Sequence, residues 1–291
     1  MASHPHMGLG DARCVTKPTA DARPWWGLPD TPVPGGMPEL AKALLWIELA
    51  IVLLVSLGRS AVYSIVSIVS ALTAPGPLSS QAANLNNSLA PDRPWLDLTY
   101  QLLRIAFALV PVALAAYLLV RSGTRVRDVW ARGGRWATWG DLGRGSWLAL
   151  GVGSVGVMFY LATYALGTNL TVVAQSLPGE WWQVPVLVLA AAENAVLEEL
   201  VVLGFVQVRL RQLGFGDSAA IGLAALLRGS YHLYQGFGGF VGNLAMGLLF
   251  GWLYRRWGRV GPFVVAHTLL DIGAFVGYAV LAGRVSWLPT L

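Results

Sequence analysis

The sequence predicts an all-α membrane protein: a polytopic bundle of about seven transmembrane helices, within a range of six to eight, with the N-terminus in the cytoplasm. The first observation is composition, because 55% of the 291 residues are hydrophobic and only 12% are charged, whereas about 25% of an average soluble domain is charged. The second is that the apolar residues form long runs, and a helix needs ~20 such residues to cross ~30 Å of hydrocarbon. The third is that arginines collect in alternate loops between these runs, as in proteins that cross a membrane several times.

The chain divides into a tail and a membrane domain. Residues 1–37 are rich in Pro, Gly and Asp and lack the apolar core of a signal peptide, so we expect a disordered N-terminal tail. The single cysteine, Cys14, lies in this tail, which excludes an intrachain disulfide and a C-x-x-C metal site. Residues 38–285 form the predicted transmembrane helical domain, with the catalytic-type core at residues 182–282.

Seven apolar segments are the predicted spans. The first begins near Glu39, includes the run ALLWIELAIVLLVSL and extends as one long helix to about residue 72; a separate span at residues 59–72 would raise the count. The others cover residues 98–120, 146–166, 182–208, 218–234, 240–254 and 260–281. The fifth and sixth are short, so we expect them to be tilted or to cross the hydrocarbon incompletely.

The positions of the arginines predict the orientation. Three loops are rich in arginine. The loop between the second and third segments contains Arg121, Arg125, Arg127, Arg132, Arg135 and Arg144. The loop after the fourth segment contains Arg209 and Arg211, and the loop after the sixth contains Arg255, Arg256 and Arg259. Of the alternate loops, only the first has an arginine, Arg93. The positive-inside rule therefore places the N-terminus in the cytoplasm and the C-terminus outside. The net charge of +5 follows from this topology, and we expect the lipid bilayer, and no nucleic acid, as a partner.

Several ionisable residues fall inside predicted spans, where each costs about 2.5–3.5 kcal/mol on insertion scales. The fourth segment contains Glu193, Glu198 and Glu199, the fifth contains His232, and the seventh contains His267 and Asp271. Residues four apart lie on one helical face, so His267 and Asp271 point the same way, and Asn194 shares a face with Glu198. These groups form either a structural polar network between helices or a functional site.

A further carboxylate, Glu48, lies in the first span. We expect it to pair with Arg104 of the second span and to have a structural role. The glycine-rich stretches 151–156 and 242–251 indicate close helix packing, because small residues let helices approach each other.

Three short motifs occur in order along the last third of the chain: EELVVL at residues 198–203, RGSYH at 228–232 and HTLLD at 267–271. They resemble the motifs Glu-Glu-x-x-x-Arg, Phe-x-x-x-His and His-x-x-x-Asn/Asp of the CPBP family of intramembrane glutamic endopeptidases, the CAAX-prenyl-protease and bacteriocin-processing group. The resemblance covers about residues 190–275 and uses both histidines outside the tail.

The sequence departs from this family pattern at two positions. Leu203 stands where the first motif has arginine, and Arg228 stands where the second motif has phenylalanine. The family arginine would neutralise the acidic pair, so we hypothesise that Arg228, one turn before His232, supplies the positive charge from the neighbouring helix.

The resemblance implies that the chain is an enzyme that hydrolyses peptide bonds within the membrane. It assigns Glu198 and His232 to activating water, and His267 and Asp271 to stabilising the oxyanion or holding the water, with Glu199 in support. Because an ionised carboxylate cannot donate a hydrogen bond, we expect Asp271 to act by orienting His267. The implied partner is a peptide or protein substrate, and the composition is similar to that of bacterial multi-pass cell-membrane proteins.

No cofactor is expected, although the same Glu, His and Asp set could bind zinc with one open position. The chain lacks H-E-x-x-H, so we favour a metal-independent site. Two other functions stay open: a non-catalytic membrane scaffold or regulatory protein that retains the polar network, which Leu203 favours, and a solute transporter, which the lack of an inverted repeat disfavours.

If Glu198, His232 and His267 form one site, they must lie at a similar depth in the bilayer. At 1.5 Å per residue, Glu198 and His267 lie roughly 10–15 Å from the cytoplasmic ends of their spans, but His232 lies roughly 24 Å in. A shared site therefore requires the fifth segment to be tilted or displaced.

Overall fold

The computed structural model describes residues 39–177 and 179–290, and most of them are helical. The predicted tail, including Cys14, lies outside the described residues.

The first predicted span is two helices rather than one, because the chain bends after residue 54. Helices α1 (Glu39–Leu54) and α2 (Leu57–Thr73) are inclined by 56°. At the bend the Ser56 hydroxyl donates to the carbonyl of Val52 at 2.5 Å, and such back-bonding commonly bends helices. Gly58 permits the close approach, since a Cβ there would lie 2.8 Å from the carbonyl oxygen of Leu53.

The second span consists of α3 (Pro94–Ala108) and α4 (Val110–Arg121), with an interruption at Leu109. Pro111 lies in the first turn of α4 and has no N–H to continue the hydrogen bonds of α3. The basic loop that follows contains a short helix, α5 (Val126–Ala131), which was not predicted.

Helix α6 (Trp139–Ala165) begins earlier than predicted because Thr138 and Asp141 form a capping box. Arg144 therefore lies in α6 and not in the loop.

The fourth segment continues further than predicted. Helix α7 (Gln183–Val201) passes into a π-helical segment (Val202–Gln207) and then into α8 (Val208–Gln212). The indole N–H of Trp130 donates to the carbonyl of Gly204 at 3.1 Å, which satisfies a backbone group in the irregular segment.

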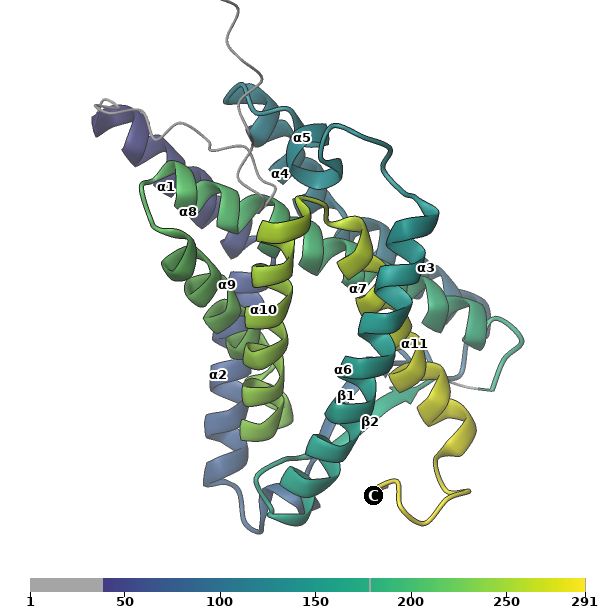
Figure 1. Ribbon diagram of the computed structural model, residues 1–291. Coiled ribbons are helices and arrows are strands. Elements are labelled where there is room, and N and C mark those ends of the chain that lie inside the picture. The colour runs from purple at the N-terminus through teal and green to yellow at the C-terminus, as the bar shows by residue number, and fades with distance from the viewer. Residues whose placement is uncertain (1–38, 178, 291) are drawn as a thin grey trace, which may run out of the picture.

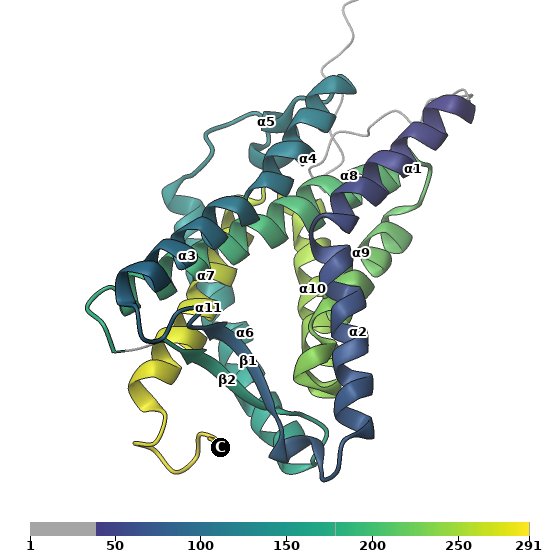
Figure 2. The same cartoon turned by 180° about the vertical axis from the view of Figure 1, so that it is seen from behind.

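The last three predicted spans correspond to α9 (Asp217–Tyr231), α10 (Phe237–Trp257) and α11 (Gly261–Leu281), with a 3-10 turn (Leu233–Gln235) between α9 and α10. Figures 1 and 2 show α2, α9 and α10 side by side on one side of the molecule, and α6, α7 and α11 together with α3 on the other. Helices α4 and α5 lie toward the same end as α8.

The prediction of a helical fold holds for most of the described residues, but two short strands were not predicted. Two short strands, β1 (Ala82–Asn87) and β2 (Thr171–Ser176), pair in parallel with Ala82 opposite Thr171. The sequence of β1, AANLNN, has low strand propensity, so the pairing depends on its neighbour: Asn86 donates its side-chain amide to the carbonyl of Ala174 at 3.0 Å. The strands join two inter-span segments that are distant in the chain.

Four described helical segments are long and apolar enough to cross a membrane: Pro94–Arg121, Trp139–Ala165, Phe237–Trp257 and Gly261–Leu281. The bent pair of α1 and α2 raises the number to five if it is one span. Helix α9 has only 15 residues, and α7 carries three glutamates, so neither meets these criteria. The chain is therefore a multi-pass membrane protein by its helices, and the count of seven stays a prediction.

The expected pairing of Glu48 with Arg104 is wrong. Glu48 forms ion pairs with Arg209 at 2.8 Å and with Arg121, while Arg104 donates to the side-chain oxygen of Asn86 at 3.0 Å. The bend in α1 and α2 and the extension of α8 bring Glu48 and Arg209 together, and neither feature was predicted.

Candidate active site

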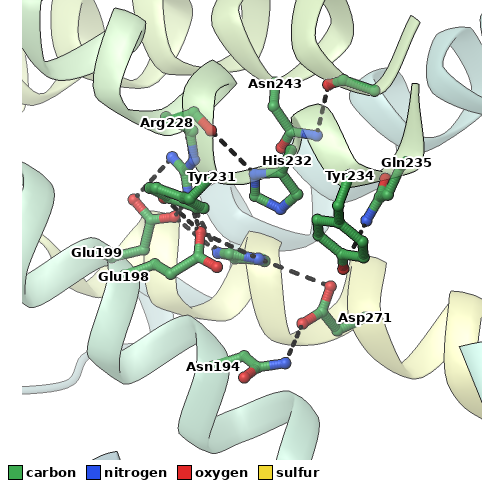
Figure 3. A network of polar contacts seen from close by, with 12 residues as sticks. Asn194, Glu198, Glu199, Arg228, Tyr231, His232, Tyr234, Gln235, Asn243 and Asp271 are labelled. Atoms are coloured by element: carbon green, nitrogen blue, oxygen red, sulfur yellow. Dashed lines mark hydrogen bonds and ion pairs between the residues drawn. The ribbon is translucent and has the colours of Figure 1, made fainter. Parts of the chain in front are cut away.

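The predicted site residues come from three helices that meet in the interior. Helix α7 supplies Glu198 and Glu199, the end of α9 supplies Arg228 and His232, and α11 supplies His267 and Asp271 (Figure 3). Because α7 and α11 lie in one helix group and α9 lies in the other, this cluster joins the two groups.

The innermost part of the cluster is an ion pair between Glu199 and Arg228, both with fully buried side chains. Arg228 Nη2 pairs with Glu199 Oε1 and also lies 3.2 Å from Glu198 Oε2. The guanidinium carbon lies 5.5 Å from the ring centroid of Phe250, so an aromatic face covers the charge. One arginine therefore contacts both adjacent carboxylates.

The ring of His267 is held by Glu199. Its Nδ1 lies 2.8 Å from Glu199 Oε1 and 3.1 Å from Arg228 Nη2. Arginine and an ionised carboxylate offer only donors and only acceptors respectively, so the Nδ1 hydrogen belongs to the bond with Glu199. Nε2 is left facing Asp271 Oδ1 at 3.6 Å and Glu198 Oε2 at 4.0 Å.

Glu198 has one occupied oxygen and one free oxygen. Tyr231 donates its hydroxyl to Glu198 Oε2 at 2.7 Å, the same oxygen that faces Arg228. Oε1 accepts no hydrogen bond from any residue within 39–177 or 179–290. The carboxylate is thus fixed in place while one oxygen can receive a proton.

His232 follows directly after α9 and caps its last turn. The carbonyl of Arg228 is 3.0 Å from His232 Nδ1 and can only accept, so Nδ1 carries the hydrogen. The neutral ring then has its lone pair on Nε2. The ring centroid of His232 is 4.7 Å from that of Tyr231, the residue that holds Glu198, and Figure 3 shows the ring of His232 between Tyr231 and Tyr234.

Asp271 lies beside His267 without a hydrogen bond to its ring, so its orienting role stays a prediction. Its Oδ1 is 3.6 Å from His267 Nε2, which is too long for a hydrogen bond, and its Oδ2 accepts from Asn194 Nδ2 at 3.4 Å. The orienting residue for His267 is Glu199, because its oxygen lies at hydrogen-bonding distance from the ring. The reason is that α7 places Glu199 against the Nδ1 side of the ring, opposite Asp271.

The depth mismatch expected for His232 disappears in the structure. Because the helical chain continues through α8 to Gln212, Glu198 and His232 each lie about 14 or 15 residues from the loop that joins α8 to α9. At 1.5 Å per residue this corresponds to roughly 20 Å for both.

Three further residues, Leu203, Tyr231 and Glu193, complete the comparison between the predicted and the observed site. Leu203 is fully buried in the main apolar core, so the position of the family arginine is filled by packing. Tyr231 was not predicted as a site residue, and the only available signal was its position between Arg228 and His232. Glu193 stays apart from the cluster, and its buried Oε1 has no hydrogen-bond partner among the described residues.

Metal binding has no geometric support in the part of the chain that the structure describes. No group of three or more His, Cys, Asp and Glu side chains there is arranged to hold an ion.

Comparison with known proteins connects this region to one family. Residues 180–273 match the family model described as Type II CAAX prenyl endopeptidase Rce1-like, so the resemblance expected from the motifs is confirmed for this part of the chain. The match includes all three motifs and covers about a third of the 291 residues. No curated protein and no solved structure matches the chain.

Proposed function

We propose that this chain is an intramembrane endopeptidase in which Glu198 and His232 activate water for hydrolysis of a peptide bond. The family match over residues 180–273 supports a peptidase, and the long apolar helices support catalysis within a membrane. The observation that carries the proposal is Glu198, a carboxylate with one oxygen bonded to Tyr231 and the other free.

The reaction needs a base, a donor to the developing oxyanion and a proton for the leaving amine. Glu198 Oε1, assisted by the neutral Nε2 of His232, removes a proton from water as the water oxygen bonds to the scissile carbonyl carbon. In this step His267 carries hydrogens on both ring nitrogens: Nδ1–H donates to Glu199, which fixes the ring, and Nε2–H donates to the oxyanion. The C–N bond then breaks as the oxyanion re-forms the carbonyl and the amine nitrogen takes the proton held by Glu198, so that a carboxylic acid and an amine are released and Glu198 is again a carboxylate.

In this proposal Arg228 pairs with both Glu198 and Glu199 and so supplies the positive charge that the family motif takes from the arginine missing at Leu203. Asp271, held by Asn194, lies beside His267 Nε2, so that its carboxylate faces the ring nitrogen that donates to the oxyanion. We further propose the predicted topology: about seven spans, with α7 and α9 completing the bundle, a cytoplasmic N-terminus and cleavage near the cytoplasmic half of the bilayer.

The test is peptide hydrolysis by purified full-length protein in detergent or nanodiscs. The substrates are a peptide library together with matched prenylated and unprenylated cysteine peptides, because the family description names CAAX prenyl peptides. Glu198→Gln keeps the size of the side chain but removes the general base. It should therefore lower kcat at least about 10³-fold, within the range that a positioned acid or base contributes to the rate. The matched control is Glu193→Gln, on the same helix and outside the cluster, which should retain activity.

A non-catalytic scaffold is the second candidate, and Leu203 is the observation that favours it. Wild-type protein that is folded, binds the peptides and cleaves none of them would support the scaffold and reject the endopeptidase. Activity that is equal in wild type and Glu198→Gln would also reject the proposed mechanism. Activity that persists after exhaustive chelation would separate the proposed mechanism from that of a zinc enzyme.

A further inference from the structure

A pocket of about 690 Å³ lies behind the catalytic helices, outside the acidic cluster. It is an open pocket, bordered by the segment that joins α5 to α6, by the first turn of α6 and by residues of α7 and α11. The volume is within the range of about 300–1,000 Å³ that small-molecule and lipid-sized ligands occupy.

The walls of the pocket are apolar and aromatic. Val196 and Leu200 of α7 and Val264 and Val265 of α11 form the inner wall, and three tryptophans stand around it: Trp130, Trp136 and Trp139. Trp139, at the start of candidate span α6, is 88% exposed, and Trp147, further along the same helix, is also exposed. Exposed tryptophans at the end of a span are typical of the membrane–water interface.

The polar groups at the pocket leave a positive charge unneutralised. Asp141 is paired with Arg259 at 2.6 Å, so its carboxylate is already neutralised. The guanidinium of Arg135, at the pocket, makes no ion pair or hydrogen bond with any side chain in residues 39–177 and 179–290. A ligand with an apolar chain and an anionic head would complement both parts of this pocket.

We propose that this pocket binds one anionic phospholipid, with an acyl chain against Val196, Leu200 and Val264 and the headgroup phosphate on Arg135. The occupant is a lipid because the pocket combines an apolar wall with an unpaired arginine at the end of a membrane span. An arginine fork matches phosphate geometry and binds it with two parallel hydrogen bonds.

The site has a structural link to the catalytic cluster. Leu200 directly follows Glu199 on α7, and Val264 lies three residues before His267 on α11. An acyl chain between these walls would support the same two helices, α7 and α11, that position Glu199 and His267 for their bond. Lipid binding itself does not depend on the proposed peptidase activity and is measured separately from it.

The experiment is native mass spectrometry of delipidated full-length protein titrated with phosphatidylglycerol or with phosphatidylcholine of the same acyl chains. Wild type should retain one phosphatidylglycerol and bind it more tightly than phosphatidylcholine. Arg135→Gln should weaken phosphatidylglycerol binding about tenfold, as expected for loss of a charge-assisted hydrogen bond. Ala137→Trp, an exposed loop position that lines the pocket, should weaken both lipids by filling the space.

The matched control is Arg125→Gln, the same change of charge at an exposed arginine of the same basic region but outside the pocket, and it should bind as wild type does. Equal binding of the two phospholipids, or equal loss in Arg125→Gln and Arg135→Gln, would reject a specific headgroup site. Displacement of phosphatidylglycerol by inorganic phosphate alone would show that the acyl chain is not held, and a peptide substrate that competes with the lipid would show that the pocket is a substrate groove. Each of these results would overturn the proposal.

Discussion

Two fully buried arginines, Arg209 and Arg228, hold carboxylates in different ways. Arg209 has four partners on its two terminal nitrogens: it binds Glu48 at 2.8 Å, the carbonyl of Leu118 at 2.8 Å, and the side chains of Ser122 and Gln212. These bonds connect α8 to α1 and to α4, and none of them involves a histidine or a tyrosine.

In the cluster around Arg228, a single arginine is shared between two carboxylates. One arginine faces Glu198 and Glu199, and His267 and Tyr231 also bond to these carboxylates. Acceptors outnumber fixed cations, and Glu198 Oε1 is left without a partner. The comparison indicates that a buried arginine surrounded by satisfied groups stabilises the helix packing, whereas one shared between two carboxylates leaves a reactive oxygen.

The largest expected effect is at Arg228. Arg228→Ala leaves two buried carboxylates uncompensated, so we expect a loss of about 3–5 kcal/mol of stability together with loss of peptide cleavage. Adding Leu203→Arg, which restores the family arginine one turn after Glu199, should recover part of both. Denaturation midpoints and cleavage rates of the single and double variants measure this, and a double variant no better than Arg228→Ala would reject the exchange of roles.

Arg209→Met should lower stability by a similar amount, about 3–5 kcal/mol, because it leaves Glu48 buried and unpaired. The cleavage rate per folded molecule should stay close to that of wild type. Combining it with Glu48→Gln removes the unpaired charge and should restore much of the stability, as thermal unfolding in detergent would measure. A folded Arg209→Met protein without activity would contradict the division between the two clusters.

Tyr231→Phe tests whether the fixed position of Glu198 matters for chemistry. Loss of a hydrogen bond to a charged group is worth about 1.5–3 kcal/mol, so kcat should fall about 10–100-fold with KM nearly unchanged. Tyr160→Phe is the control, because that hydroxyl accepts from the backbone N–H of Val172 outside the site. Equal kcat values for the two variants would show that Tyr231 has no part in positioning the base.

The smallest effect is expected at Arg121, the second partner of Glu48. Its side chain is 50% exposed, so solvent screens the pair and Arg121→Gln should change stability by no more than about 1 kcal/mol. Side-by-side unfolding of Arg121→Gln and Arg209→Met would show how much burial decides the strength of an ion pair to one carboxylate. A larger loss at Arg121 would contradict that reading.

Much of the architecture could be predicted because apolar length and helical periodicity are local properties. The later helices α10 and α11 begin and end within a few residues of the predicted segments. The bend after α1, the π segment and the parallel strands could not be predicted, because each depends on a partner distant in the chain: Trp130 bonds to Gly204, and Asn86 bonds to the backbone of β2. The pairing of Glu48 was mispredicted for the same reason.

For the candidate site, the sequence by itself determined which side chains are available: the motifs contain Glu198, Glu199, Arg228, His232 and His267 at helical spacing, and ionisable groups inside apolar segments are too costly to be incidental. Only the tertiary structure decided which atoms meet. Hydrogen-bond direction requires that donors and acceptors be placed within about 3 Å, and sequence spacing does not determine that across three helices. The structure therefore assigned the ring of His267 to Glu199 instead of Asp271 and added Tyr231 as the residue that holds Glu198.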